Sequence, residues 1–257
     1  MNSKSFFQEG VIAVTGASRG VGAAIANKLL ANGHTVACLS RSGLAPSGYE
    51  ETAESTRRML PMKCDVTDDS SISTCLSELS KKPGGLRVLI NNAGIHTQGP
   101  SAKFATEDFE HLLRTNTLAV FSACRESYPY LKEAGGGVII NIGSFFARLG
   151  ASHNACYSAT KAAVDALTRS LAVEWARDNI TVINLAPGYV ETDLNYDYLV
   201  RDDVQAYLSR QIPIGRASQP SEVGEIVAMM LRIDPMLLTG QTLYADGGHS
   251  IAHGNIR

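Results

Sequence analysis

Residues 11–22 read VIAVTGASRGVG, and this stretch decides the fold. Residues 11–15 are apolar or β-branched and predict a buried strand, and a segment of helical period follows from Gly20 to about Ala31. Glycines at 16, 20 and 22 stand between the two. Gly16 permits a tight turn, and Gly20 and Gly22 let the backbone approach a pyrophosphate at the N-terminus of a helix. The order of strand, glycine-rich turn and helix therefore predicts a dinucleotide-binding unit.

The rest of the chain repeats this alternation of strand and helix. Apolar runs predict strands at 35–40, 59–65, 86–91, 137–142, 180–185 and 241–245, and helices are expected from about 68, at about 106–133 and 157–178, and from about 222. Residues 188–219 show little clear pattern. Apolar strands that alternate with helices favour a parallel sheet covered on both faces, and right-handed crossovers favour the doubly wound topology. The expected fold class is α/β, a Rossmann-type doubly wound parallel β-sheet flanked by helices, in a single domain of residues 1–257.

Composition sets further bounds on the function. A chain of 257 residues, 44% of them hydrophobic, is long enough to bury a full core. Its formal charge of -2, with basic residues scattered along the chain, argues against nucleic acid and against an anionic membrane surface as partners. The first ten residues, MNSKSFFQEG, have no hydrophobic signal core, and glycines interrupt the apolar run that follows. We therefore expect no membrane span and a cytoplasmic location.

The chain has five cysteines, without C-x-x-C pairing or metal-ligand spacing. An odd number of cysteines in a chain of this length fits a reducing compartment with unpaired thiols. No cluster of His, Asp or Glu suggests a metal site either. The sequence predicts that the protein needs no metal ion.

The stretch CYSATKAAV (156–164) places Tyr157 and Lys161 one helical turn apart. Such a pair, taken alone, usually lies on a helix surface where the lysine is in contact with solvent. A tyrosine titrates near 10, so it is a poor general base at neutral pH unless a nearby cation favours its phenolate. Lowering its pKa towards 7 requires roughly 4 kcal/mol, and a buried Lys161 could supply much of that.

Several motifs, in order, resemble the short-chain dehydrogenases/reductases, and the resemblance covers almost the whole chain. They are T-G-x-x-x-G-x-G at 15–22, N-N-A-G at 91–94, Asn116, Ser144, Y-x-x-x-K at 157–161, P-G at 187–188 and TGQTLYADGG at 239–248. Each motif alone is weak, but their common order and spacing are specific. The closest resemblance is to the NADPH-dependent 3-oxoacyl-carrier-protein reductase-like ketoreductases.

This resemblance implies a catalytic set of Asn116, Ser144, Tyr157 and Lys161. Tyr157 would donate its proton to the carbonyl oxygen in reduction and take the alcohol proton in oxidation. Ser144 would form a hydrogen bond with the same oxygen. Lys161 would also hold the nicotinamide ribose, and Asn116 would support a water chain that carries protons to Lys161.

The end of the second predicted strand points to NADP(H) rather than NAD(H). An acid that binds the ribose of NAD is expected there, about 20 residues after the glycines. Ser40 stands at that place, Arg41 follows it, and no Asp or Glu occurs between Ser18 and Tyr49. Arg41 can bind a 2′-phosphate bidentately, and Arg19 could add a second charge.

The remaining cofactor contacts follow from the resemblance. They are Gly16, Ser18, Arg19, Gly20, Val21 and Gly22 in the turn, Ser40 and Arg41, Asp65 and Val66 beside the adenine, Asn91, Asn92, Ala93 and Gly94, Tyr157 and Lys161, and Pro187, Gly188, Val190 and Thr192.

The substrate pocket is expected in the loops after the fourth, fifth and sixth strands. Its predicted residues are His96, Ser144, Phe145, Phe146, His153, Tyr157 and Tyr189. Residues 189–218, which include three further tyrosines, are expected to form a lid. So many rings suggest an apolar, cyclic or aromatic ketone, although aromatic residues line most small-molecule pockets.

The sequence therefore predicts an NADPH-dependent enzyme that reduces a ketone or aldehyde to an alcohol. One alternative is a reductase of 3-oxoacyl thioesters on carrier protein or coenzyme A. By resemblance, an acidic carrier protein would dock on basic side chains such as Lys132 and Arg177. Their positive charge is offset by three acidic neighbours, Glu133, Glu174 and Asp178, which weakens this alternative. A second is an NAD-dependent alcohol dehydrogenase that runs toward oxidation. A third is a dinucleotide sensor without activity, against which the pair Tyr157 and Lys161 argues.

The expected partners are a small carbonyl substrate and further copies of the chain. By resemblance the protein is a homotetramer, with the helices at about 106–133 and 154–178 in one interface and the C-terminal region in another.

Overall fold

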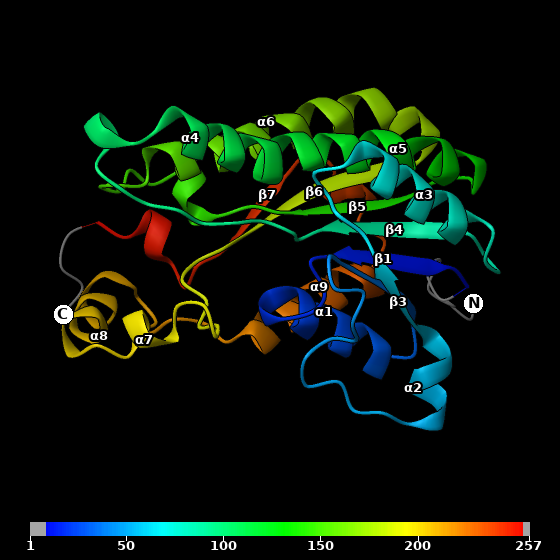
Figure 1. Cartoon of the computed structure of the whole chain (residues 1–257), viewed down its shortest axis with the longest axis horizontal. Coiled ribbons are helices and arrows are strands. Elements are labelled where there is room, and N and C mark those ends of the chain that lie inside the picture. The colour runs from blue at the N-terminus through cyan, green and yellow to red at the C-terminus, as the bar shows by residue number, and fades with distance from the viewer. Residues whose placement is uncertain (1–8, 254–257) are drawn as a thin grey trace.

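The computed structural model describes residues 9–253. At its centre is a sheet of seven strands in the order β3-β2-β1-β4-β5-β6-β7, with each pair of neighbours parallel (Figure 1). The strands are β1 (Val11–Thr15), β2 (Thr35–Ser40), β3 (Met59–Lys63), β4 (Leu86–Asn91), β5 (Gly137–Ile142), β6 (Ile180–Pro187) and β7 (Thr242–Ala245). The order reverses between β1 and β4, so the predicted doubly wound parallel sheet is confirmed.

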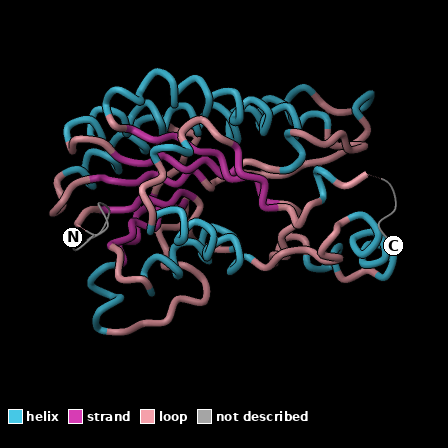
Figure 2. Tube along the Cα trace, turned by 180° about the vertical axis from the view of Figure 1, so that it is seen from behind, coloured by secondary structure: helices cyan, strands magenta, loops and turns pink. Residues whose placement is uncertain are grey.

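Helices cover both faces of the sheet. They are α1 (Gly20–Ala31), α2 (Ala53–Arg58), α3 (Asp69–Ser80), α4 (Thr106–Leu113), α5 (Ala119–Glu133), α6 (Ala155–Trp175), α7 (Tyr196–Leu199), α8 (Asp202–Gln211) and α9 (Pro220–Arg232). Figure 1 shows α3, α4, α5 and α6 on one face and α1 with α9 on the other, and Figure 2 shows the same layers from behind. α7 and α8 lie apart from the sheet, near the short turn at His249–Ile251 (Figure 1).

The central strands are buried on both faces. In β1, Ile12 and Val14 belong to the apolar cluster that contains residues of α1 and α9. Val11 and Ala13 belong to the opposite cluster, with residues of α3, α5 and α6. Successive side chains of a strand point to opposite faces, so two buried faces require a continuous apolar run. This is why VIAVT lacks alternation.

Several elements differ from the sequence-based expectation. The helix expected over 106–133 contains a π-helical segment, Arg114–Leu118, between α4 and α5. α2 has no buried residue, so it lacks the apolar period that marks a helix. The stretch without clear pattern contains α7 and α8, which build a small apolar cluster of their own around Leu208. α9 begins at Pro220 rather than near Glu222, because the Glu222 side chain completes a capping box with Gln219.

None of the helices between residues 9 and 253 is long and apolar enough to cross a membrane.

Candidate active site

The glycine turn and the start of α1 form a cradle for an anion. Gly16 has φ +66°, and a Cβ there would lie 2.9 Å from the Cα of Ala93. A Cβ at Gly22 would lie 2.3 Å from the carbonyl oxygen of Gly16. Arg19, at the N-cap of α1, forms no side-chain cap hydrogen bond, and the first turn has no acidic residue. Backbone N–H groups at this helix start suit a phosphate, so the turn fits a dinucleotide.

Thr15 ties this turn to the end of β4. Its hydroxyl oxygen accepts hydrogen bonds from the backbone N–H groups of Asn92 and Ala93, both at 3.0 Å. The Asn92 amide donates in turn to the Thr15 carbonyl at 3.0 Å. Asn91 lies apart, because its amide donates to Asn141 inside the sheet. We infer that Thr15 positions the N-N-A-G motif, a role that sequence reasoning did not assign to it.

Ser40 occupies the place of the expected acid, and it shapes the backbone there. Its hydroxyl accepts a hydrogen bond from the Gly43 N–H at 3.1 Å and shares one with Ser42 at 3.2 Å. Arg41, which follows it, is exposed. Hydrogen bonds from Thr67 lower the pKa of Asp65, and the positive charge of Arg41 adds to this effect.

Tyr157, on α6, lies beside Ser144, in the loop after β5, close enough for the two hydroxyl groups to interact. Burial raises the pKa of Tyr157 to about 12, and the Ser144 hydroxyl offsets only part of that rise. The Lys161 Nζ lies 5.9 Å from the centroid of the Tyr157 ring. In this structure the pKa of Tyr157 is raised rather than lowered, because its phenolate would lose hydration. The lowering of this pKa by Lys161 stays a prediction.

Lys161 joins α6 to the end of β5. Its side chain is buried, and its Nζ donates to the carbonyl oxygen of Ile142 at 2.8 Å. Burial lowers the pKa of Lys161 to about 8, because the charged form has lost hydration. Ile142 is the last residue of β5. The ammonium is thus held near the loop that carries Ser144.

Asn116 lies in the π-helical segment and is fully buried. Its amide donates to the Ile95 carbonyl and accepts from the Ile95 N–H, both at 2.9 Å, and it donates to Thr160 at 3.2 Å. A Cβ at Gly94 would lie 3.2 Å from the Asn116 oxygen and 3.7 Å from the Lys161 Nζ. Asn116 and Lys161 therefore both lie beside Gly94 in the loop after β4.

Aromatic rings surround Tyr157. Its ring centroid lies 4.6 Å from that of His96 and 6.0 Å from that of Phe146, both edge to face. Phe145 lies 4.1 Å from Phe146 and 5.1 Å from Tyr189. Rings from the loops after β4, β5 and β6 therefore form one wall. An imidazole nitrogen of His96 bonds the Asn154 side chain at 2.8 Å.

His153 and His249 differ from the sequence-based expectation. His153 is exposed with φ +65°, and no aromatic ring of residues 9–253 is in contact with it. His249 was not predicted, yet its ring lies 5.1 Å from Phe145 and 5.9 Å from Tyr189. A single histidine beyond the last strand belongs to no motif of fixed spacing that would identify it as a site residue. In the sequence it is preceded by the D-G-G turn of residues 246–248.

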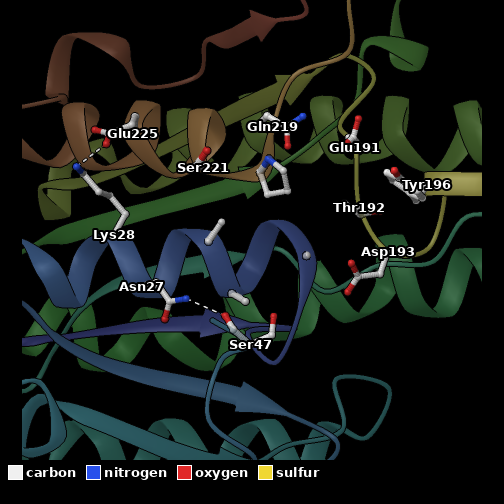
Figure 3. A pocket seen from close by; sticks show the side chains of 14 residues that line it. Asn27, Lys28, Ser47, Glu191, Thr192, Asp193, Tyr196, Gln219, Ser221 and Glu225 are labelled. Carbon is white, nitrogen blue, oxygen red and sulfur yellow. Dashed lines mark hydrogen bonds and ion pairs between the residues drawn. The ribbon is translucent and has the colours of Figure 1, made fainter. Parts of the chain in front are cut away.

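An open pocket of about 510 Å³ lies between α1, α9 and the segment before α7. Figure 3 shows the side chains that line it. Of the predicted site residues, Gly20 and Thr192 line it, whereas Ser144 and Tyr157 do not. Glu191 and Asp193 add carboxylates to its wall. The pocket therefore adjoins the glycine turn but is separate from the ring wall around Tyr157. Across residues 9–253, no group of three or more His, Cys, Asp and Glu side chains is placed to hold a metal ion.

Comparison with known proteins identifies the family. Residues 10–201 match the family model described as short chain dehydrogenase. The chain belongs to this family. As a short-chain dehydrogenase, it is an oxidoreductase that acts on alcohol or carbonyl groups with a nicotinamide cofactor.

Its relatives have several activities. A chloroplastic tropinone reductase homolog of Arabidopsis thaliana is 33% identical, over 93% of this chain and 74% of its own. A 3-oxoacyl-[acyl-carrier-protein] reductase of Vibrio harveyi is 32% identical, over 93% of this chain and 97% of its own. The crystal structure of a gluconate 5-dehydrogenase from Burkholderia cenocepacia, in complex with NADP and tartrate, matches with a TM-score of 0.87 and 29% identity, over 98% of this chain and 100% of its own.

Proposed function

We propose that this short-chain dehydrogenase reduces a ketone or aldehyde carbonyl to an alcohol with NADPH. The contact between Tyr157 and Ser144, with Lys161 one helical turn further along α6, carries the proposal. With a pKa of about 12 the Tyr157 phenol is protonated at neutral pH and so has a proton to donate. Proton donation to a carbonyl oxygen is the step that reduction requires.

Each residue of the set has a role at the substrate oxygen. Tyr157 donates its proton to that oxygen, and Ser144 stabilises the negative charge that develops there. The nicotinamide cofactor, when bound, supplies the hydride. The Lys161 ammonium stabilises the phenolate that remains on Tyr157. Asn116 positions the loop after β4 and contacts Thr160, next to Lys161, from where it would support proton return.

The proposed cofactor is NADP(H), and the absence of an acid after β2 supports it. Arg19 and Arg41 are exposed and can pair with a 2′-phosphate. The gluconate 5-dehydrogenase neighbour is in complex with NADP. The remaining proposed contacts are Gly16, Ser18, Gly20, Val21, Gly22, Ser40, Asp65, Val66, Asn92, Ala93, Gly94, Tyr157, Lys161, Pro187, Gly188, Val190 and Thr192.

The ring wall around Tyr157 is the proposed substrate pocket. It favours an apolar or cyclic ketone, since His96, Phe146 and Tyr189 offer flat faces. Residues 189–218, with α7 and α8, are the proposed lid.

A second candidate is reduction of 3-oxoacyl thioesters, which several relatives carry out according to their names. An acidic carrier protein needs free positive charge on the enzyme surface. Lys132 is paired here, since its Nζ lies 3.1 Å from the Asp178 carboxylate. This pairing favours a free ketone or aldehyde as substrate.

The test is NADPH consumption by the purified protein against four carbonyl compounds. They are a β-keto thioester, an aliphatic ketone, a cyclic ketone and an aromatic ketone. We expect turnover of the cyclic or aromatic ketone, and a loss of at least about 100-fold in kcat for Tyr157→Phe, because general acid–base catalysis contributes roughly 10²–10⁴-fold. A strong preference for the thioester would favour the second candidate, and a fully active Tyr157→Phe variant would refute the mechanism.

A further inference from the structure

His249 contacts three separate segments on the substrate side of the protein. Its ring centroid lies 5.1 Å from that of Phe145, 5.9 Å from that of Tyr189 and 6.4 Å from that of Tyr207. Phe145 directly follows Ser144, Tyr189 lies just after β6, and Tyr207 lies on α8. One side chain from the end of the chain therefore touches the loop that carries Ser144, the loop after β6 and the proposed lid.

A continuous row of rings joins His249 to the catalytic side of the pocket. Tyr157 meets Phe146 edge to face at 6.0 Å. Phe146 in turn contacts Phe145 at 4.1 Å and Tyr189 at 6.1 Å. Both of these rings contact His249. Tyr157 and His249 thus stand at opposite ends of one aromatic wall.

The backbone around His249 is held in place by an acidic side chain. The two carboxylate oxygens of Asp246 accept hydrogen bonds from the N–H groups of Gly248, at 3.0 Å, and Ser250, at 2.8 Å. Gly248 has φ +86°, and a Cβ there would lie 2.9 Å from Pro213, just after α8. This close approach explains the glycine, and it fixes His249 against the lid.

The imidazole of His249 is buried and has a free polar atom. Its exposed fraction is 5%, and its Nδ1 has no hydrogen-bond partner among residues 9–253. The titratable groups that face it are Tyr189, Tyr207 and Asp246. Burial lowers the pKa of His249, although the negative charge of Asp246 opposes this, so the ring is neutral at pH 7. The Nδ1 is sealed from solvent in this structure, so a substrate reaches it only when a surrounding ring, such as that of Tyr207 on the proposed lid, moves. Buried polar atoms are rarely left unpaired, and a substrate atom that bonds this nitrogen would then gain a hydrogen bond without displacing a protein partner.

We propose that His249 determines substrate specificity, because it closes the end of the pocket away from Tyr157 and bonds an uncharged oxygen of the substrate through its free ring nitrogen. This inference rests on the proposed function. The substrate class is a cyclic ketone that carries a hydroxyl or a second carbonyl on the side opposite the reacting carbonyl. An uncharged oxygen suits the neutral ring, whereas the nearby Asp246 carboxylate disfavours an anion at this position.

The experiment compares cyclohexanone with 4-hydroxycyclohexanone, each with NADPH. His249→Phe keeps a ring and removes both nitrogens, and His249→Asn restores a polar atom close to the backbone. We expect the wild-type protein to prefer the hydroxyketone in kcat/KM. In His249→Phe the KM for the hydroxyketone should rise about five- to tenfold relative to the KM for cyclohexanone, which corresponds to the loss of one hydrogen bond to an uncharged partner. His249→Asn should recover part of the preference.

The outcomes separate this inference from the proposed function. If His249→Phe keeps the wild-type preference between the two ketones, or if the wild-type protein turns over neither ketone, His249 does not have this role. If Tyr157→Phe reduces either ketone as fast as wild type, the proposed function fails whatever His249 does. Thermal unfolding of each variant checks that it is folded. Should His249→Phe be unfolded, His249→Leu against His249→Asn makes the same comparison.

Discussion

Lys161 is the residue at which function and stability conflict most clearly. Its ammonium lies inside the protein, where burial lowers its pKa from the ordinary value of 10.5 to about 8. Between these values the unfolded chain binds more protons than the folded one, so stability rises with pH from about 8 to 10.5. Below pH 8 both states are protonated, and burial of the charge destabilises the fold by roughly 3 kcal/mol.

The first prediction is that Lys161→Met stabilises the protein at pH 7 while it abolishes activity. Met fills a similar volume without a charge, but the Ile142 carbonyl loses its donor, so we expect a net gain of about 1–3 kcal/mol. The measurement is thermal unfolding at pH 7 and pH 10, with the gain smaller at pH 10. Lys82→Met, at an exposed position, is the matched control and should change little. A lower unfolding temperature for Lys161→Met at pH 7 would show that the hydrogen bond outweighs the burial of charge.

The second prediction concerns Arg41 and the cofactor. An Arg–phosphate contact is charge-assisted and contributes roughly 1.5–3 kcal/mol. Arg41→Ala should therefore weaken NADPH binding by about 10- to 100-fold and leave NADH binding nearly unchanged, since NADH has no 2′-phosphate. Cofactor titration by fluorescence measures both dissociation constants. Arg57→Ala, an exposed arginine on α2, serves as control. Equal losses for the two cofactors would contradict a contact with the 2′-phosphate.

At the scale of elements, the π-helical segment between α4 and α5 has a structural consequence. It places Asn116 so that one side chain satisfies both the N–H and the C=O of Ile95. The third prediction is that Asn116→Ala destabilises the protein by about 2–4 kcal/mol, because two buried backbone groups lose their partner. Urea unfolding measures the change. Thr117→Ser, which keeps the neighbouring hydroxyl that bonds the Thr160 carbonyl, is the control. A loss below about 1 kcal/mol would mean that water replaces the amide.

The elements that the sequence predicted well are those that bury apolar side chains on two faces. β1, β2, β4, β5 and β6 follow from such runs, because a parallel sheet between two helical layers leaves no solvent-facing side. The edge strands β3 and β7 contain no buried residue and give a weaker signal. α2 was missed because none of its residues is buried. The π-helical segment was missed because its residue types do not differ from those of the α-helices on either side. Tyr157, Lys161 and Ser144 could be predicted as site residues because they stand in motifs of fixed spacing. His249 was missed because its contacts come from distant segments, which no local pattern records.

At the scale of the whole molecule, the candidate site is assembled at the carboxyl ends of the parallel strands. The turn after β1 and the loops after β4, β5 and β6 all leave the carboxyl ends of parallel strands, where ligands bind in open α/β sheets. The segment after β7 adds His249 at the same end. The lid and the C-terminal segment lie side by side at this end of the molecule (Figure 1). This leaves the outer faces of α5 and α6 without a catalytic role.

Those outer faces carry exposed apolar side chains. Phe121 on α5 and Val173 on α6 are exposed, Val173 to 83%, and Leu237, just before β7, is exposed to 97%. Exposed apolar side chains on adjacent helices are typical of an interface between subunits. We therefore propose that the protein is a homotetramer that uses α5 and α6 in one interface and the region of Leu237 in the other.

The last prediction follows from this proposal. The wild-type mass in solution, measured by light scattering after size-exclusion chromatography, should be four times the chain mass of 27.4 kDa. The double variant Phe121→Glu with Val173→Glu should reduce it to that of a dimer, because charges buried in an apolar interface lose hydration without a partner. Leu44→Glu alters an apolar residue that is 66% exposed in the loop after β2, away from both surfaces, and should leave the mass unchanged. If the wild-type protein has the mass of one chain, or if the double variant keeps the wild-type mass, these helices are not a subunit interface.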